Sequence, residues 1–211
     1  MDMSGSEESD GEFMDAHWEI WLDDNQVAYE WLKNNGCEYI SVISLRAGAL
    51  LAAEAAQKLD FDMFVTWQPV VNGSNYLSQF LRLKVAAAMT GSATEKSSVR
   101  EIKQELLEAR CVEIAGYALS PDLAKSIEEK IFVNNPDLLP KKICWFEILA
   151  DEDRPLPVVS KKAVASLEQN GLIVDLKKVY GSPFWGAAEI VENPSLLDVT
   201  TATLMQVTAD V

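Results

Sequence analysis

The chain has 211 residues, with 33 acidic and 18 basic side chains and a formal net charge of −15. This charge repels phosphate backbones and anionic lipid, so we expect no binding to nucleic acid or to a membrane surface. No run of about 18 apolar residues is present, and the acidic start lacks the basic and apolar regions of a signal peptide. We therefore expect a cytoplasmic protein.

The predicted secondary structure alternates between helices and strands. We expect strands at the nearly continuous apolar runs 39–44, 63–71, 142–149 and 172–179, and helices at 16–34, 49–58 and 158–169. This alternation predicts a doubly wound, mostly parallel sheet within a single domain that spans residues 1–211.

The segment between the second and third predicted strands is too long for an ordinary crossover. It contains helical patterns at 74–88, 97–109 and 121–130. We therefore expect residues 74–138 to form a helical cap or lid within the domain.

The three cysteines, Cys37, Cys111 and Cys144, are odd in number and lack CxxC spacing. This arrangement is typical of reduced, mostly buried thiols and not of disulfides or a zinc site. We expect neither a metal nor another cofactor.

The sequence SLRAG at 44–48 has the strand, turn and helix pattern that holds the nucleophile in GxSxG hydrolases. Arg46 occupies the centre of this turn, Ser44 the position of the first glycine and Gly48 that of the last. A guanidinium cannot attack a carbonyl, so the usual nucleophile is missing.

Several segments together resemble the α/β-hydrolase family, and more closely the subfamily called exosortase A system-associated hydrolase 2, in which the elbow also tends to hold Arg. They are DMSGSEESDGEF, DAHWEIWLDD, SLRAGALLA, WQPVVNGSNYLSQFLRLKVAAAM, VEIAGYALSPDL and GSPFWGAAEI. The resemblance covers nearly the whole chain from Asp2. It implies a three-layer α/β sandwich with a helical cap. It also implies an ester or acyl hydrolase linked to bacterial exopolysaccharide and protein-sorting systems.

The resemblance also implies where the remaining catalytic groups belong. The acid follows the third predicted strand, where Asp151 and Asp153 stand in a loop that is also typical of a solvated surface. The histidine follows the last strand, where GSPFWG has none, and the only histidine is His17, at the start of the first predicted helix. We therefore expect an impaired catalytic site, with Ser44, Asp151 and Asp153 as the remaining catalytic candidates.

Arg46 predicts a different function for the elbow. It precedes a helix, whose N-terminus favours anions, and we expect it to lie near Gln68 and Asp151 at the carboxyl ends of the strands. One hypothesis is a non-catalytic site at which Arg46 and Gln68 bind a small anionic, acyl or saccharide ligand. The other is an internal salt bridge from Arg46 to Asp151 or Asp153. The aromatic residues nearby, Trp67, Trp145, Phe184 and Trp185, fit either a sugar-binding surface or the core.

By the same resemblance, Met1 falls after the first strands of the fold, so we expect an N-terminally truncated member. The first strand present, 39–44, is then an apolar, uncharged sheet edge. Such an edge needs a pairing strand. The alternatives are a start upstream of Met1, or a protein partner or second copy bound at this edge.

Overall fold

The computed structural model describes residues 2–6, 8–90, 98–132, 134–186 and 191–209. The chain forms two compact units. The first consists of Met1–Glu38 and Asn72–Phe132, and the second of Tyr39–Val71 and Val133–Val211. Most of the predicted insertion at 74–138 thus belongs to the first unit, together with the N-terminal segment.

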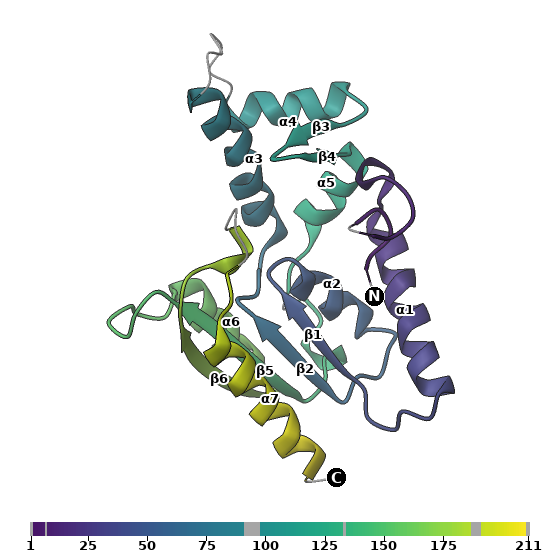
Figure 1. Ribbon diagram of the computed structural model, residues 1–211, viewed down its shortest axis with the longest axis vertical. Coiled ribbons are helices and arrows are strands. Elements are labelled where there is room, and N and C mark those ends of the chain that lie inside the picture. Colours follow the sequence, from purple (N-terminus) through teal and green to yellow (C-terminus); the bar gives the residue numbers. More distant parts are fainter. Residues whose placement is uncertain (1, 7, 91–97, 133, 187–190, 210–211) are drawn as a thin grey trace. The chain divides into compact units, whose positions relative to one another are not determined.

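The second unit contains a four-stranded parallel sheet (Figure 1). Its strand order is β1 (Ser41–Leu45), β2 (Met63–Trp67), β5 (Lys142–Leu149) and β6 (Ile173–Tyr180). Helix α7 (Pro194–Ala209) covers one face, and α2 (Gly48–Ala55) and α6 (Val158–Gln169) lie behind the other (Figure 1). The predicted three-layer α/β architecture is confirmed.

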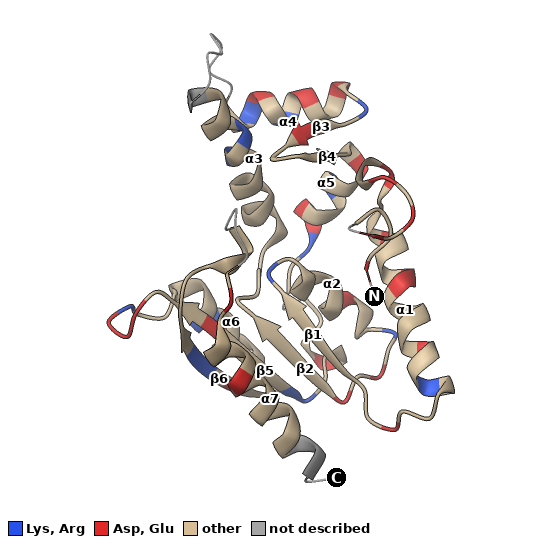
Figure 2. Cartoon of the chain, viewed as in Figure 1, with Lys and Arg blue, Asp and Glu red and all other residues tan. Residues whose placement is uncertain are grey.

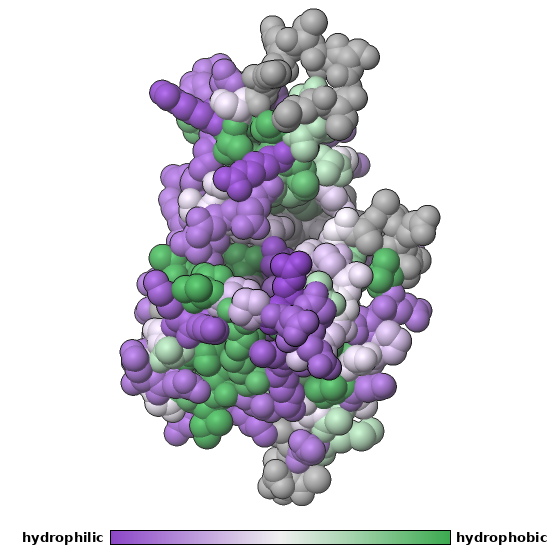
Figure 3. Space-filling view, turned by 90° about the vertical axis from the view of Figure 1, so that its left-hand side faces the viewer, coloured by the Kyte–Doolittle hydropathy of each residue, from purple (hydrophilic) through white to green (hydrophobic). Residues whose placement is uncertain are grey.

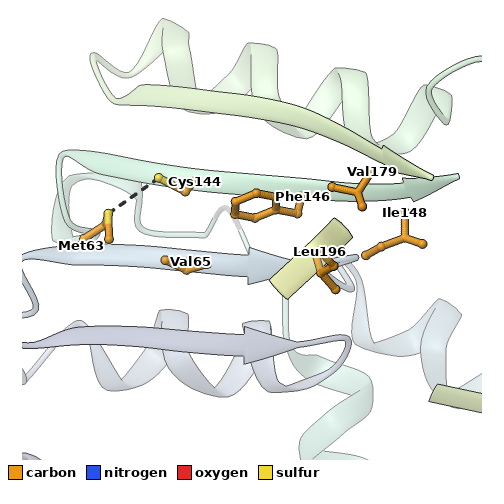
Figure 4. Packing of buried hydrophobic residues seen from close by; sticks show 7 residues of the cluster. All are labelled: Met63, Val65, Cys144, Phe146, Ile148, Val179 and Leu196. Atoms are coloured by element: carbon orange, nitrogen blue, oxygen red, sulfur yellow. Dashed lines mark hydrogen bonds between the residues drawn. The ribbon is translucent and has the colours of Figure 1, made fainter. Parts of the chain in front are cut away.

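Alternation of side chains along the strands places one half of the core between the sheet and α7. Its centre is a cluster of fully or nearly fully buried residues (Figure 4): Met63, Val65, Cys144, Phe146, Ile148, Val179 and Leu196. Trp67 packs against this cluster, and its Nε1 donates to Thr200 Oγ1 of α7 at 3.0 Å. The buried cluster and the Trp67–Thr200 hydrogen bond thus join α7 to this face of the sheet.

Cys144 lies wholly inside this cluster, with its Sγ 3.7 Å from Met63 Sδ, whereas Cys37 and Cys111 are partly exposed. All three thiols are free, but only Cys144 is buried, so the expectation of mostly buried thiols is wrong for Cys37 and Cys111. Burial raises the pKa of the Cys144 thiol, and the nearby Asp175 adds to this effect. Because only the exposed thiolate reacts, iodoacetamide at pH 8 is expected to alkylate Cys37 and Cys111 but not Cys144. Peptide mass mapping checks this, and equal labelling of Cys144 in folded protein would contradict the packing.

The two outer strands of the sheet differ in charge. β6 carries Asp175, Lys177 and Lys178, and charges of this kind discourage pairing with another chain. β1 carries no charge (Figure 2), and its Ile43 is 49% exposed. Apolar side chains lie among polar ones on the face that Figure 3 shows. On β6 itself, Ile173 is 67% exposed. Among the described strands, β1 is therefore the less protected edge, as the sequence predicts.

The first unit is mainly helical. It contains α1 (Trp18–Asn34), α3 (Gly73–Thr90), α4 (Val99–Glu108), α5 (Pro121–Glu129), and the hairpin of β3 (Val112–Ile114) and β4 (Tyr117–Leu119). Ser98 and Glu101 form a capping box on α4, and Ser120 caps α5 ahead of Pro121. Nowhere in the described chain is a helix both long and apolar enough to cross a membrane.

The predicted helices and main strands are all present, and the bounds of β5 and α6 match those expected. β2 ends at Trp67 instead of residue 71, because the chain turns at Gln68 and Pro69 has no N–H for a ladder. Helix α7 and the β3–β4 hairpin were not predicted. α7 is rich in Thr and Val, which are weak helix formers, and strands of three residues are too short to show a period.

Candidate functional site: the elbow of β1 and the turn after β2

Two consecutive parallel strands end in left-handed residues that are not glycine. Arg46 follows β1 with φ 51°, and Gln68 follows β2 with φ 45°. Such a conformation costs about 1–3 kcal/mol and persists only where its surroundings fix it. The predicted elbow is therefore present, with Arg46 at its tip and α2 beginning at Gly48.

Backbone hydrogen bonds to the segment after β2 hold the elbow in place. Arg46 N donates to Trp67 O at 3.1 Å, and Arg46 O accepts from Val70 N at 3.0 Å. Arg46 O also accepts from Ala49 N in the first turn of α2. The strained turn is thus determined by both the strand beside it and the helix after it.

The guanidinium of Arg46 lies between a carbonyl and an aromatic ring. Its Nη1 donates to Gln68 O at 3.4 Å, and its Cζ is 5.2 Å from the centroid of the Trp185 ring. Trp185 in turn meets Phe184 edge to face, with ring centroids 5.3 Å apart. A cation over an indole face is attracted by about 0.5–2 kcal/mol, which helps to orient the guanidinium.

Behind the turns lies a buried carboxylate. Glu147 of β5 is only 1% exposed, and its Oε1 and Oε2 accept from Gln68 Nε2 at 2.9 Å and Trp145 Nε1 at 2.8 Å. Gln68 Oε1 accepts from Ile148 N at 2.6 Å. Sequence reasoning missed Glu147, although a single acidic residue inside the apolar run KICWFEIL was a usable signal. The Gln68 amide is bound by protein groups at both ends.

None of the contacts described above involves a side chain of the three catalytic candidates. Ser44 is 5% exposed, and its hydroxyl donates to Val65 O at 3.2 Å, so it is neither exposed nor activated. Asp151 and Asp153 are exposed, and Asp151 Oδ2 is 3.6 Å from Arg154 Nε. The pair of Asp151 with Arg154 is exposed and joins near neighbours in the chain, so it contributes little stability.

The remaining sequence candidates have structural positions. His17 is the N-cap residue of α1 in the first unit, and its side chain makes no capping hydrogen bond. Trp145 is fully buried and belongs to the core, whereas Trp67, Phe184 and Trp185 are partly buried. Among the described residues, no group of three or more His, Cys, Asp or Glu side chains could hold a metal ion.

Thr66, in β2, has a buried hydroxyl without a hydrogen-bond partner. Among the described buried side chains, its Oγ1 is the polar atom without a hydrogen-bond partner. Thr66→Val removes this unpaired hydroxyl and is expected to stabilise the protein by about 1 kcal/mol. Thr200→Val, at a hydroxyl that accepts from Trp67, is expected to destabilise it by a similar amount. Urea unfolding measures both, and a loss of stability in both variants would contradict the assignment.

Comparisons with known proteins place this geometry in a fold family. No family model and no curated protein sequence matches the chain. The solved structures that are similar include a carboxylesterase of Nitrososphaera gargenis, with TM-score 0.58, 13% identity, and coverage of 100% of this chain and 80% of that one. Est1E of Butyrivibrio proteoclasticus, solved with bound ferulic acid, has TM-score 0.55, 17% identity, and coverage of 86% and 66%.

MenH of S. aureus is similar too, with TM-score 0.52, 12% identity, and coverage of 98% of this chain and 82% of that one. The chain thus spans from about two thirds to four fifths of the length of these structures. At identities this low the likeness concerns the fold, and it agrees with the parallel sheet, the elbow and the flanking helices described above. The chain therefore has the α/β-hydrolase fold.

Proposed function

We propose that this chain is an α/β-hydrolase-fold protein that does not use a serine nucleophile and that binds a carboxylate-bearing ligand at Arg46. The observation that carries this proposal is the arginine at the strained tip of the elbow, with φ 51°. Non-glycine residues in such conformations concentrate at active sites and ligand clamps.

The lack of a catalytic set supports the non-enzymatic part. The elbow holds a guanidinium, Ser44 is buried and bonded to a carbonyl, and the single histidine of the chain is the N-cap of α1. Loss of one triad member alone costs several orders of magnitude in rate. Ester hydrolysis, by resemblance the alternative function, would require another nucleophile and base.

Two features support an anionic ligand. The guanidinium is a planar donor that matches a carboxylate in a bidentate geometry, and it stands at the N-terminal end of α2, where the helix dipole favours a negative charge. The aromatic pair Phe184 and Trp185 beside it offers apolar surface for the rest of the ligand. A carboxylic acid with an acyl, aryl or saccharide part fits this combination.

The setting is part of the proposal. The resemblance of WQPVVNGSNYLSQFLRLKVAAAM and the other segments named above supports a place beside an exosortase and exopolysaccharide system in the cytoplasm. The uncharged β1 edge supports a pairing strand from a protein partner or a second copy. The predicted role of residues 74–138 as a lid belongs to this same proposal.

Treatment with a fluorophosphonate, followed by intact-mass analysis, tests the non-catalytic part. We expect no adduct and no hydrolysis of p-nitrophenyl acetate above the uncatalysed rate. Arg46→Ser is expected to remain inactive too, because a serine without a base is not a nucleophile. A single adduct on one serine, with turnover lost when that serine is replaced, would show that the chain is a hydrolase.

Titration with benzoate, followed by tryptophan fluorescence, tests the binding part. We expect saturable binding that weakens at least tenfold in Arg46→Ala. Arg154→Ala is the matched control, because Arg154 is an exposed arginine in the same unit, paired only weakly with Asp151. Equal affinity in wild type and Arg46→Ala, or tighter binding of inorganic phosphate than of benzoate, would contradict the proposed ligand class.

A further inference from the structure

We infer that Gln68 is a positioning residue for the Arg46 guanidinium, and that the buried Glu147 carboxylate fixes Gln68 in that role. The inference rests on the ligand site proposed above. It concerns how that site is kept in shape, which neither the fold nor the sequence pattern specifies.

Gln68 is attached to β5 by three hydrogen bonds. Its backbone N donates to Phe146 O at 2.8 Å, its Nε2 donates to Glu147 Oε1 at 2.9 Å, and its Oε1 accepts from Ile148 N at 2.6 Å. These bonds hold a non-glycine residue at φ 45°. The left-handed turn after β2 is therefore fixed by β5, which binds both the backbone and the side chain of Gln68.

The donors in this network allow only one arrangement. A backbone N–H can only donate, so the amide atom facing Ile148 is the oxygen, and the amide nitrogen must face Glu147. The Trp145 indole can also only donate, at 2.8 Å, so Glu147 has to accept at both oxygens. A carboxylate accepts at both oxygens. In a glutamine at position 147, by contrast, the amide NH₂ would face one of the two donors, Gln68 Nε2 or Trp145 Nε1.

The fixed turn then directs Arg46. The carbonyl of Gln68 accepts from Arg46 Nη1 at 3.4 Å, while the Trp185 ring lies 5.2 Å from the guanidinium carbon. Rotation of the Gln68 peptide would move this carbonyl away from Arg46. Of these two contacts, only the one with the Trp185 ring would then remain to orient the guanidinium. Glu147 thus acts on the site through Gln68, without itself being exposed to a ligand.

Arginine modification by phenylglyoxal, mapped to Arg46 by peptide mass, tests the positioning without any ligand. The variants are Gln68→Ala and Glu147→Gln, with Gln57→Ala as a control at an exposed glutamine of the same unit. We expect Arg46 to react severalfold faster in both network variants, and at the wild-type rate in the control. Circular dichroism establishes that each variant is folded. Unchanged rates in the folded network variants would overturn the inference.

Benzoate affinity separates this inference from the proposed function. We expect at least a fivefold loss in Gln68→Ala, and no further loss when this change is added to Arg46→Ala. Binding that is lost in Arg46→Ala but unchanged in Gln68→Ala would overturn the positioning role and keep the ligand site. Faster modification of Arg46 in the network variants of a protein that does not bind benzoate would keep the positioning role and remove the proposed function.

Discussion

Gly73→Ala is expected to destabilise the first unit by about 3 kcal/mol or more, at the upper end of the range for overpacking. Gly73 is the first residue of α3 and is buried, and a Cβ there would overlap the carbonyl oxygen of Ile127, in the last turn of α5. The overlap involves backbone atoms, so no change of rotamer relieves it. The first unit has to separate α3 from α5 or to shift both.

The contact between these helices is also bonded, which limits such a shift. Gly73 N donates to Lys130 O at 2.8 Å, and Asn72 forms an isolated antiparallel β-bridge with Ile131. Urea unfolding followed by circular dichroism measures the loss of stability. Gly48→Ala is the matched control, because a Cβ at the start of α2 meets only Ser44 Cβ at 3.9 Å, and its effect should stay within about 1 kcal/mol. Equal effects of the two changes would show that α3 and α5 are not so closely packed.

Glu147→Ala is expected to destabilise the second unit by about 3–5 kcal/mol. The change removes the acceptor of the buried Trp145 Nε1, at about 1–3 kcal/mol, and that of the partly buried Gln68 Nε2, at about 1 kcal/mol, and it also creates a small cavity. The measurement is the free energy of unfolding in urea, together with the near-ultraviolet circular dichroism of the tryptophans.

Glu168→Ala controls for the loss of a glutamate as such, because Glu168 is exposed on α6 of the same unit. Its effect should lie within about 0.5 kcal/mol of zero. A Glu147→Ala protein as stable as the Glu168→Ala protein would mean that the network around Gln68 does not contribute to folding. The inference on Arg46 positioning would then lose its structural basis.

The sequence alone determined the elements whose signal is local. The run 142–149 is nearly continuously apolar, which is typical of a buried parallel strand, and 158–169 has the apolar stripe of an amphipathic helix. Both elements were therefore predicted with their bounds. The elbow at SLRAG and the identity of Arg46 at its tip were likewise visible, because strand, turn and helix follow each other directly. The missing serine and the missing histidine could also be read from the chain.

The tertiary structure decided what depends on neighbours in space. Gln68 was expected as a ligand-binding residue, and its amide is bound between Glu147 and Ile148 of another strand, which supports the positioning role proposed above. Asp151 was expected beside Arg46 and lies against Arg154. α7 contains several Thr and Val residues, which are weak helix formers, and packs on the core through Leu196, so burial contributes to its stability. Pairwise contacts between strands remote in sequence have no local signature, and these contacts give the Arg46 site its shape.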